Sequence, residues 1–138
     1  MNNNRKIQVA LVDDDACLCK AVSRLLAASG IQSTTYTSAE AFLDDQAYQD
    51  AECLILDIQL NGLSGIDLQR HLIAIEKLVP VIFITAHDEP ETREQAQRLG
   101  CVAYLRKTDP GQAVIEAIRR AVSSPAVAPA EQAAAMCV

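Results

Sequence analysis

Short hydrophobic runs alternate with longer segments of mixed polarity along most of this chain. Runs that are apolar at nearly every position are typical of strands buried on both faces, as in the interior of a parallel sheet. One further run is rich in β-branched residues, which also favour strands. The expected strands are residues 7–12, 31–36, 53–56, 81–84 and 103–106.

The segments between these strands have the length and apolar spacing of amphipathic helices. Gly30 ends the first of them, and Ser38 is a suitable N-cap for the second. Asp109 and Pro110 predict the cap and first turn of the last helix. The expected helices are residues 16–29, 38–43, 66–75, 89–99 and 110–122. Five strand–helix units, (βα)5, with right-handed crossovers predict an α/β fold, a doubly wound parallel five-stranded sheet.

Residues that can take part in chemistry stand at the ends of four of these strands. Asp13 and Asp14 follow the first strand, and the third strand runs into Asp57. The fourth strand runs into Thr85 and the fifth into Lys107. Ligands bind beyond the carboxyl ends of the strands in sheets of this kind. We therefore expect an acidic pair, a lone carboxylate, a hydroxyl and an amine to share one crevice.

Composition indicates one globular domain inside the cell. The 138 residues are 50% hydrophobic and 22% charged, which is ordinary for such a domain. A net charge of -6 argues against nucleic-acid binding by this chain alone. The sequence shows no membrane-spanning stretch and no signal-peptide region. Five cysteines without CxxC spacing favour free thiols in a reducing compartment. We expect a cytoplasmic protein without a membrane partner.

The last part of the chain differs in kind from the rest. Residues 123–138 are rich in alanine, contain two prolines and lack apolar periodicity. Such a composition is typical of a flexible tail or of a linker. We expect residues 1–122 to form the domain and residues 123–138 to be a flexible tail or a truncated linker.

Four short motifs occur at the strand ends in a fixed order: Val12-Asp13-Asp14, Leu56-Asp57 with the loop of residues 61–66, Thr85-Ala86, and Tyr104-Leu105-Arg106-Lys107. Together they resemble the response-regulator receiver domain of two-component signalling, over residues 5 to about 122. The resemblance implies a flavodoxin-like sheet of the chemotaxis-regulator type, with strand order 2-1-3-4-5.

The resemblance also implies a divalent-metal site for Mg²⁺, or Mn²⁺. Asp57 is implied as the phosphoacceptor, and Asp13 and Asp14 as the acidic pair that holds the ion with it. The backbone carbonyl of Gln59 is implied as a further ligand. Electrostatics agrees, because three carboxylates in one crevice repel one another and attract a cation. Mg²⁺ prefers oxygen ligands and keeps waters that a phosphoryl oxygen can replace.

Three further residues receive roles from the resemblance. Lys107 is implied to contact Asp57 and then the phosphoryl oxygens. Thr85 and Tyr104 are implied as the switch pair, with the hydroxyl moving onto the phosphoryl group and the ring turning inward behind it. Gln59 and His87 are implied to flank the phosphoryl group and to influence its hydrolysis.

The implied function is a phosphorylation-dependent switch that takes a phosphoryl group from a sensor histidine kinase or a phosphotransfer protein. The chain would be a regulator that assists its own phosphorylation and dephosphorylation, not an enzyme. Its output face would comprise residues 89–99, 103–106 and 110–122. The polar first segment of that face favours a monomer or a phosphorylation-dependent dimer. The output would reach a downstream protein target or a C-terminal DNA-binding domain missing from this chain.

The chain departs from the family pattern after Lys107. The family usually has a proline there, preceded by a cis peptide bond, whereas this chain has Thr108. A cis bond before threonine costs about 2.5–4 kcal/mol, so the conformation of this peptide stays open. A flavodoxin-like electron carrier is disfavoured because the aspartates after the first strand would repel a cofactor phosphate. A haloacid-dehalogenase-type hydrolase needs an aspartate at position 59, which is Gln59. The alternative that remains is a phosphate-independent interaction module.

Overall fold

A computed structural model describes residues 6–123 of the chain. The expected tail lies outside the described residues, apart from Ser123, which ends the last helix. The prediction of a flexible tail or linker at residues 124–138 is therefore not addressed by the structure.

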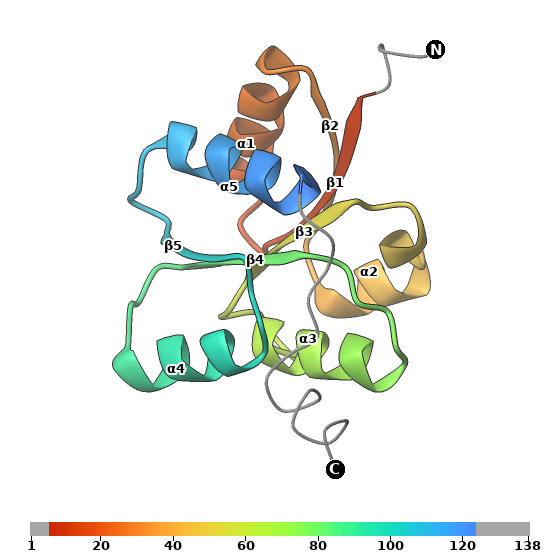
Figure 1. The fold of residues 1–138 in the computed structure, drawn as a ribbon, viewed down its shortest axis with the longest axis vertical. Helices are drawn as coiled ribbons and strands as arrows, with labels where there is room; N and C mark the ends of the chain where they lie inside the picture. Colours follow the sequence, from red (N-terminus) through yellow and green to blue (C-terminus); the bar gives the residue numbers. More distant parts are fainter. Residues whose placement is uncertain (1–5, 124–138) are drawn as a thin grey trace.

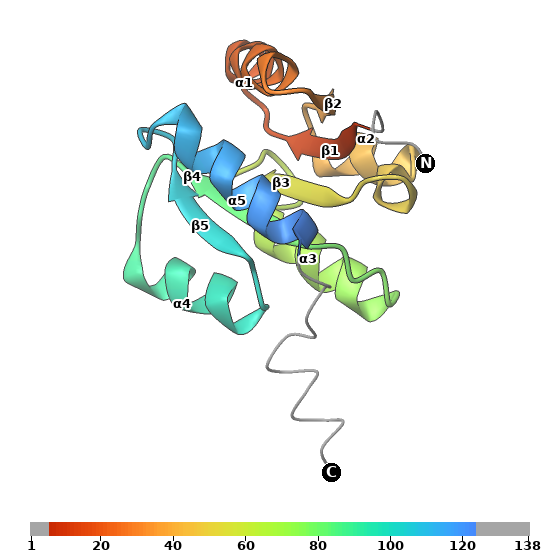
Figure 2. The same cartoon turned by 45° about the horizontal axis from the view of Figure 1, so that its top comes forward.

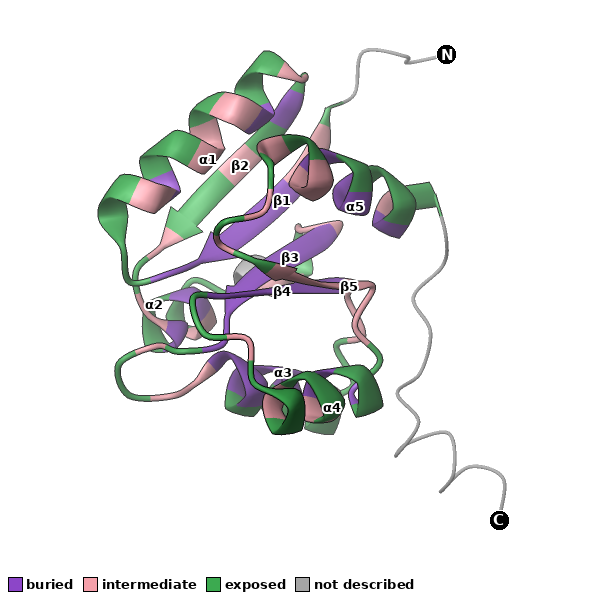
Figure 3. Ribbon diagram, turned by 90° about the vertical axis from the view of Figure 1, so that its left-hand side faces the viewer, coloured by how far each residue is buried: buried purple, intermediate pink, exposed green. Residues whose placement is uncertain are grey.

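The five expected strands form one parallel sheet in the order β2-β1-β3-β4-β5, which confirms the predicted topology. Every residue of β3 and β4 is buried, as uniformly apolar runs predict for central strands. The burial colouring of Figure 3 shows these strands enclosed between the helical layers. The strands are β1 Ile7–Val12, β2 Ile31–Tyr36, β3 Cys53–Asp57, β4 Val81–Thr85 and β5 Ala103–Arg106.

Five α-helices and one short 3-10 helix connect and cover the strands. They are α1 Ala16–Ala28, α2 Ala39–Asp44, η1 Ala47–Gln49, α3 Gly65–Ala74, α4 Pro90–Arg98 and α5 Gly111–Ser123. Helices α1 and α5 cover one face of the sheet, while α2, α3 and α4 cover the other (Figures 1 and 2). The predicted doubly wound arrangement is confirmed.

Side-chain caps fix where several helices begin. The Asp15 carboxylate accepts the backbone N–H groups of Cys17 and Leu18, and Ser38 caps α2 as expected. The last helix differs from the prediction, because it begins at Gly111. The Asp109 carboxylate accepts a hydrogen bond from the backbone N–H of Arg106, which precedes it in the chain. The prediction that Asp109 caps α5 was therefore wrong, and its carboxylate belongs to the β5–α5 turn.

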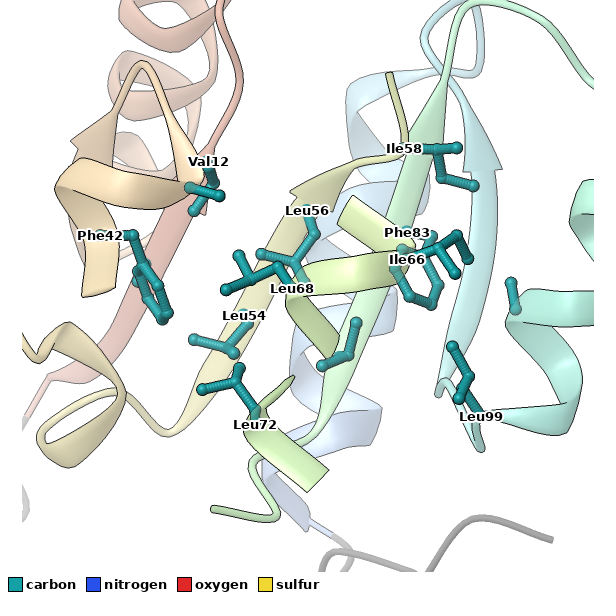
Figure 4. Close-up of a cluster of buried hydrophobic side chains, with 14 residues drawn as sticks. Val12, Phe42, Leu54, Leu56, Ile58, Ile66, Leu68, Leu72, Phe83 and Leu99 are labelled. Atoms are coloured by element: carbon teal, nitrogen blue, oxygen red, sulfur yellow. The ribbon is translucent and has the colours of Figure 1, made fainter. Parts of the chain in front are cut away.

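Two hydrophobic clusters hold the helices on the sheet. Phe42, Leu72 and Phe83 lie in the cluster beneath α2, α3 and α4 (Figure 4). Leu26 and Ile118 lie in the opposite cluster beneath α1 and α5. Burying a side chain of this size contributes about 1.5–3 kcal/mol. The two clusters fix the sheet, and the sheet fixes the relative positions of the residues at its strand ends.

No helix in the described part of the chain is long and apolar enough to cross a membrane.

Candidate functional site

Three carboxylates meet at the carboxyl ends of β1 and β3. Those two strands are neighbours and pair Val12 with Leu56, so the residues that follow Val12 lie beside Asp57. Asp13, Asp14 and Asp57 each offer an oxygen atom, and these atoms lie within 4.8 Å of one another. Asp13 and Asp57 are 0% and 1% exposed, whereas Asp14 faces solvent. The structure thus brings together the three carboxylates that the sequence pattern assigns to one crevice.

Lys107 reaches this acidic cluster from the end of β5. Its backbone N–H donates to the carbonyl of Thr85 at 2.8 Å, which extends the pairing of β4 and β5 by one residue. Its Nζ atom lies 3.0 Å from Oδ2 of Asp57 and 3.0 Å from Oδ2 of Asp13. Every peptide bond from residue 6 to residue 123 is trans. The peptide before Thr108 is therefore trans, and Lys107 still enters the site.

The buried charges shift the pKa values of both partners in the Asp57–Lys107 pair. Burial raises the pKa of Asp57, although hydrogen bonds from Lys107 and from the Gln59 backbone act in the opposite direction. Burial alone would lower the pKa of Lys107, but its bonds to Asp57 and Asp13 outweigh burial and raise that pKa. The folded site therefore holds protons tightly, as expected where negative charge is poorly hydrated.

The donor set of the cluster fits a divalent cation. Oδ1 of Asp13 accepts the backbone N–H of Asp15 at 2.9 Å, while Oδ2 is buried and has no hydrogen-bond partner among the described residues. That oxygen faces Lys107 only as an ion pair. A buried oxygen without a hydrogen bond is costly, and all the available ligand atoms are oxygens, which Mg²⁺ prefers.

The Gln59 backbone lies next to the cluster. Its N–H donates to Oδ1 of Asp57 at 3.0 Å, and its side chain is exposed. This contact holds the start of the β3–α3 loop beside the carboxylate. The loop thus keeps the Gln59 backbone close to Asp57, and the family resemblance implies that its carbonyl is a metal ligand.

Thr85 is buried at the end of β4, with its hydroxyl bonded within its own turn. The hydroxyl donates to the carbonyl of His87 at 2.9 Å and accepts the N–H of His87 at 3.0 Å. In this conformation Thr85 is placed at the site but is held by the β4–α4 loop. His87 itself is exposed.

Tyr104 lies on β5 opposite Phe83, which is two residues before Thr85 on the neighbouring strand. Its ring is half-buried, and its buried hydroxyl lacks a hydrogen-bond partner in the described structure. The guanidinium of Arg93 on α4 lies 5.4 Å from the ring centroid, and Arg93 also pairs with Asp88. Helix α4 is therefore tied to Tyr104 by a cation–π contact.

Two further residues, Glu40 and Gly65, support the β3–α3 loop. Oε2 of Glu40 on α2 accepts the backbone N–H of Leu63 at 3.2 Å. A Cβ atom at Gly65 would lie 2.2 Å from the backbone oxygen of Asp57, so only glycine fits there. Gly65 belongs to the loop of residues 61–66, which carries part of the family resemblance, but nothing in the sequence pattern marked Glu40.

Comparisons with known proteins identify the family to which the chain belongs. A family model described as "Response regulator receiver domain" matches residues 9–119. The chain is 34% identical over 113 residues to the transcriptional regulatory protein FixJ of Azorhizobium caulinodans, covering 82% of this chain and 54% of that protein. It is 32% identical over 120 residues to the response regulator protein TmoT of Ectopseudomonas mendocina, covering 87% of this chain and 54% of that protein. The chain therefore spans about half the length of these two relatives.

Solved structures show the same fold. A crystal structure of a response regulator receiver protein from Burkholderia phymatum is 42% identical, with a TM-score of 0.75. The match covers 88% of this chain and 98% of that one.

Proposed function

The chain belongs to the response regulator receiver domain family of two-component systems, and on this premise we propose that it is a switch controlled by phosphorylation of Asp57. The observation that carries the proposal is the arrangement of Lys107, whose Nζ atom lies 3.0 Å from oxygens of both Asp57 and Asp13. A cation held between two buried carboxylates is positioned to follow charge as it moves onto a phosphoryl group.

In the proposed reaction a carboxylate oxygen of Asp57 attacks the phosphorus of a phosphohistidine, and the bond from phosphorus to the histidine nitrogen breaks. Phosphoryl transfer depends mainly on positioning and charge neutralisation. Lys107 supplies one positive charge beside the attacking oxygen. Asp13, Asp14, Asp57 and the Gln59 carbonyl would hold Mg²⁺ or Mn²⁺, which when bound neutralises further negative charge on the phosphoryl oxygens.

The proposed output begins at Thr85 and Tyr104. A phosphoryl group on Asp57 offers strong acceptor oxygens, and the Thr85 hydroxyl would exchange its bond to the His87 carbonyl for one of them. Movement of this loop would release Tyr104, whose hydroxyl has no partner among the described residues. The change would be read on the face formed by α4, β5 and α5, as a shift between two existing conformations.

The proposed partners follow from the family and from the relatives, of which this chain spans about half. A sensor histidine kinase or a phosphotransfer protein would supply the phosphoryl group. Downstream, the chain would act on a protein target. Alternatively, it would act on a DNA-binding domain of the kind proposed for the part of its relatives that the match does not cover. The protein would be a cytoplasmic regulator without substrate turnover, and a monomer or a phosphorylation-dependent dimer.

Intact mass after incubation with acetyl phosphate and Mg²⁺ tests this proposal. We expect one added phosphoryl group on the wild-type chain and none on Asp57→Ala or after addition of EDTA. An unchanged wild-type mass at every Mg²⁺ concentration would contradict the proposal. It would favour the phosphate-independent interaction module instead.

A further inference from the structure

We propose that Asp109 is a positioning residue, which sets Lys107 in the acidic cluster by closing the turn between β5 and α5. The inference rests on the proposed function, because it concerns the residue proposed to neutralise charge at Asp57. It concerns the segment in which this chain departs from the family pattern, at Thr108.

The closure consists of contacts between Arg106 and Asp109. The backbone N–H of Arg106 donates to Oδ2 of Asp109 at 2.9 Å, and the backbone N–H of Asp109 donates to the carbonyl of Arg106 at 2.9 Å. Nε of Arg106 lies 3.7 Å from Oδ1 of Asp109. These contacts close the backbone segment from residue 106 to residue 109, and Lys107 is part of this segment.

The direction of Lys107 depends on this closed turn. Lys107 leaves β5, an edge strand, and must extend its side chain past β4 toward the ends of β3 and β1. The hydrogen bond from its N–H to the Thr85 carbonyl fixes one side of the residue. The closed turn fixes the other side. Thr108 lacks the ring of the family's usual proline, so the residue itself does not restrict the backbone there. Displacing a charged group by about 1 Å can reduce a rate by as much as 100-fold.

The hydrogen bond from the Arg106 backbone to Asp109, rather than the ion pair between their side chains, should account for the effect of Asp109 on the position of Lys107. The Arg106 and Asp109 side chains are 59% and 25% exposed, and exposed ion pairs contribute little. An asparagine at position 109 keeps an acceptor for the Arg106 N–H, whereas an alanine does not. Asp109→Asn should therefore preserve the position of Lys107, and Asp109→Ala should lose it.

A control of the same chemical kind exists at the opposite end of the sheet. The N–H of Gln8 donates to Oε2 of Glu52 at 2.8 Å, and the N–H of Glu52 donates to the carbonyl of Gln8 at 2.8 Å. Glu52→Ala therefore removes a carboxylate that closes the backbone in the same way, but far along the strands from Lys107. It should lower stability without changing the rate of phosphorylation.

The experiment measures initial phosphorylation rates with acetyl phosphate and Mg²⁺ at a temperature where circular dichroism shows each variant to be folded. We expect Asp109→Ala to react about 10-fold more slowly than wild type, and Asp109→Asn and Glu52→Ala to react within about twofold of it. Lys107→Ala should be about 100-fold slower. Adding Asp109→Ala to Lys107→Ala should lower the rate no further, because Asp109 acts through Lys107.

Two results would overturn the inference. One is a wild-type rate for folded Asp109→Ala. The other is a loss in Asp109→Ala that persists fully in the Lys107→Ala background, which would mean a general effect on the fold. Asp109→Leu, which also lacks an acceptor for the Arg106 N–H, serves as a second variant if Asp109→Ala does not fold, with the same expected slowing and the same contrary outcomes. If wild type itself is not phosphorylated, the proposed function fails, and that result is distinct from either of these.

Discussion

The ammonium nitrogen of Lys107 lies 3.0 Å from Oδ2 of Asp57, although the two residues are 50 positions apart in the sequence. The pair links the edge strand β5 to the central strand β3 across the end of β4. Asp57 is nevertheless a strained carboxylate, because burial and the nearby charge of Asp13 raise its pKa despite the lysine. The buried carboxylates at this site therefore favour binding of a further positive charge.

The raised pKa of Asp57 predicts a pH-dependent stability difference between wild type and Asp57→Asn in metal-free buffer. The folded state binds this proton more tightly than the unfolded chain, whose carboxyl has a pKa near 3.8. Ionised Asp57 therefore destabilises the fold increasingly as the pH rises above that value, up to and through the folded pKa. We expect Asp57→Asn to be the more stable protein at neutral pH, with its advantage shrinking toward pH 4.

Urea unfolding at several pH values, with EDTA present, measures this difference. Asp44→Asn changes an exposed carboxylate at the end of α2 and is the control, expected to follow the wild-type profile. Parallel profiles for wild type and Asp57→Asn would show that burial of Asp57 does not shift its proton binding.

Two glycines should differ sharply in their tolerance of alanine. A Cβ atom at Gly65 would lie 2.2 Å from the backbone oxygen of Asp57, and a backbone atom cannot rotate aside as the end of a side chain can. At Gly111 the closest atom is Cδ2 of Leu25 at 2.6 Å, which is the end of a side chain that can rotate. Gly65→Ala should destabilise the fold by about 3 kcal/mol or more and Gly111→Ala by about 1 kcal/mol or less. Equal losses in thermal unfolding would contradict this reading of the site.

The sequence was sufficient to predict the sheet and the residues at its strand ends. Uniformly apolar runs predicted the central strands, and the strand order 2-1-3-4-5 implied by the family resemblance then placed Asp13 beside Asp57. The supporting contacts were not predictable in the same way. Asp109 was expected to cap α5, because an aspartate before Pro110 fits a helix start as well as it fits the observed turn. The partner of Glu40 depends on how α2 packs against a distant loop, which local patterns do not encode.

The hydroxyl of Tyr104 should contribute nothing to stability in the unphosphorylated protein. It is buried and has no hydrogen-bond partner in the described residues, so its removal relieves an unsatisfied polar group. We expect Tyr104→Phe to unfold within about 0.5 kcal/mol of wild type, or to be slightly more stable. Tyr104→Ala, which also loses the ring and its contact with Arg93, should lose about 2 kcal/mol. A marked loss in Tyr104→Phe would mean that the hydroxyl has a partner in solution.

The contact between Glu40 and Leu63 should hold the β3–α3 loop. Its carboxylate accepts the Leu63 N–H, so amide hydrogen exchange at Leu63 reports on it directly. We expect faster exchange at Leu63 in Glu40→Ala and nearly wild-type exchange in Glu40→Gln, which keeps a carbonyl acceptor. Unchanged exchange in Glu40→Ala would show that the loop keeps its conformation without this bond.

The most direct test of the account is the position of the phosphoryl group in the chain. Borohydride reduction converts a phosphorylated aspartate to homoserine, which peptide mass spectrometry then locates. After treatment with acetyl phosphate and Mg²⁺, we predict homoserine at position 57 and at no other aspartate, with none in the sample that contains EDTA. Modification at Asp13 or Asp14 instead of Asp57, or the same yield without Mg²⁺, would contradict the account.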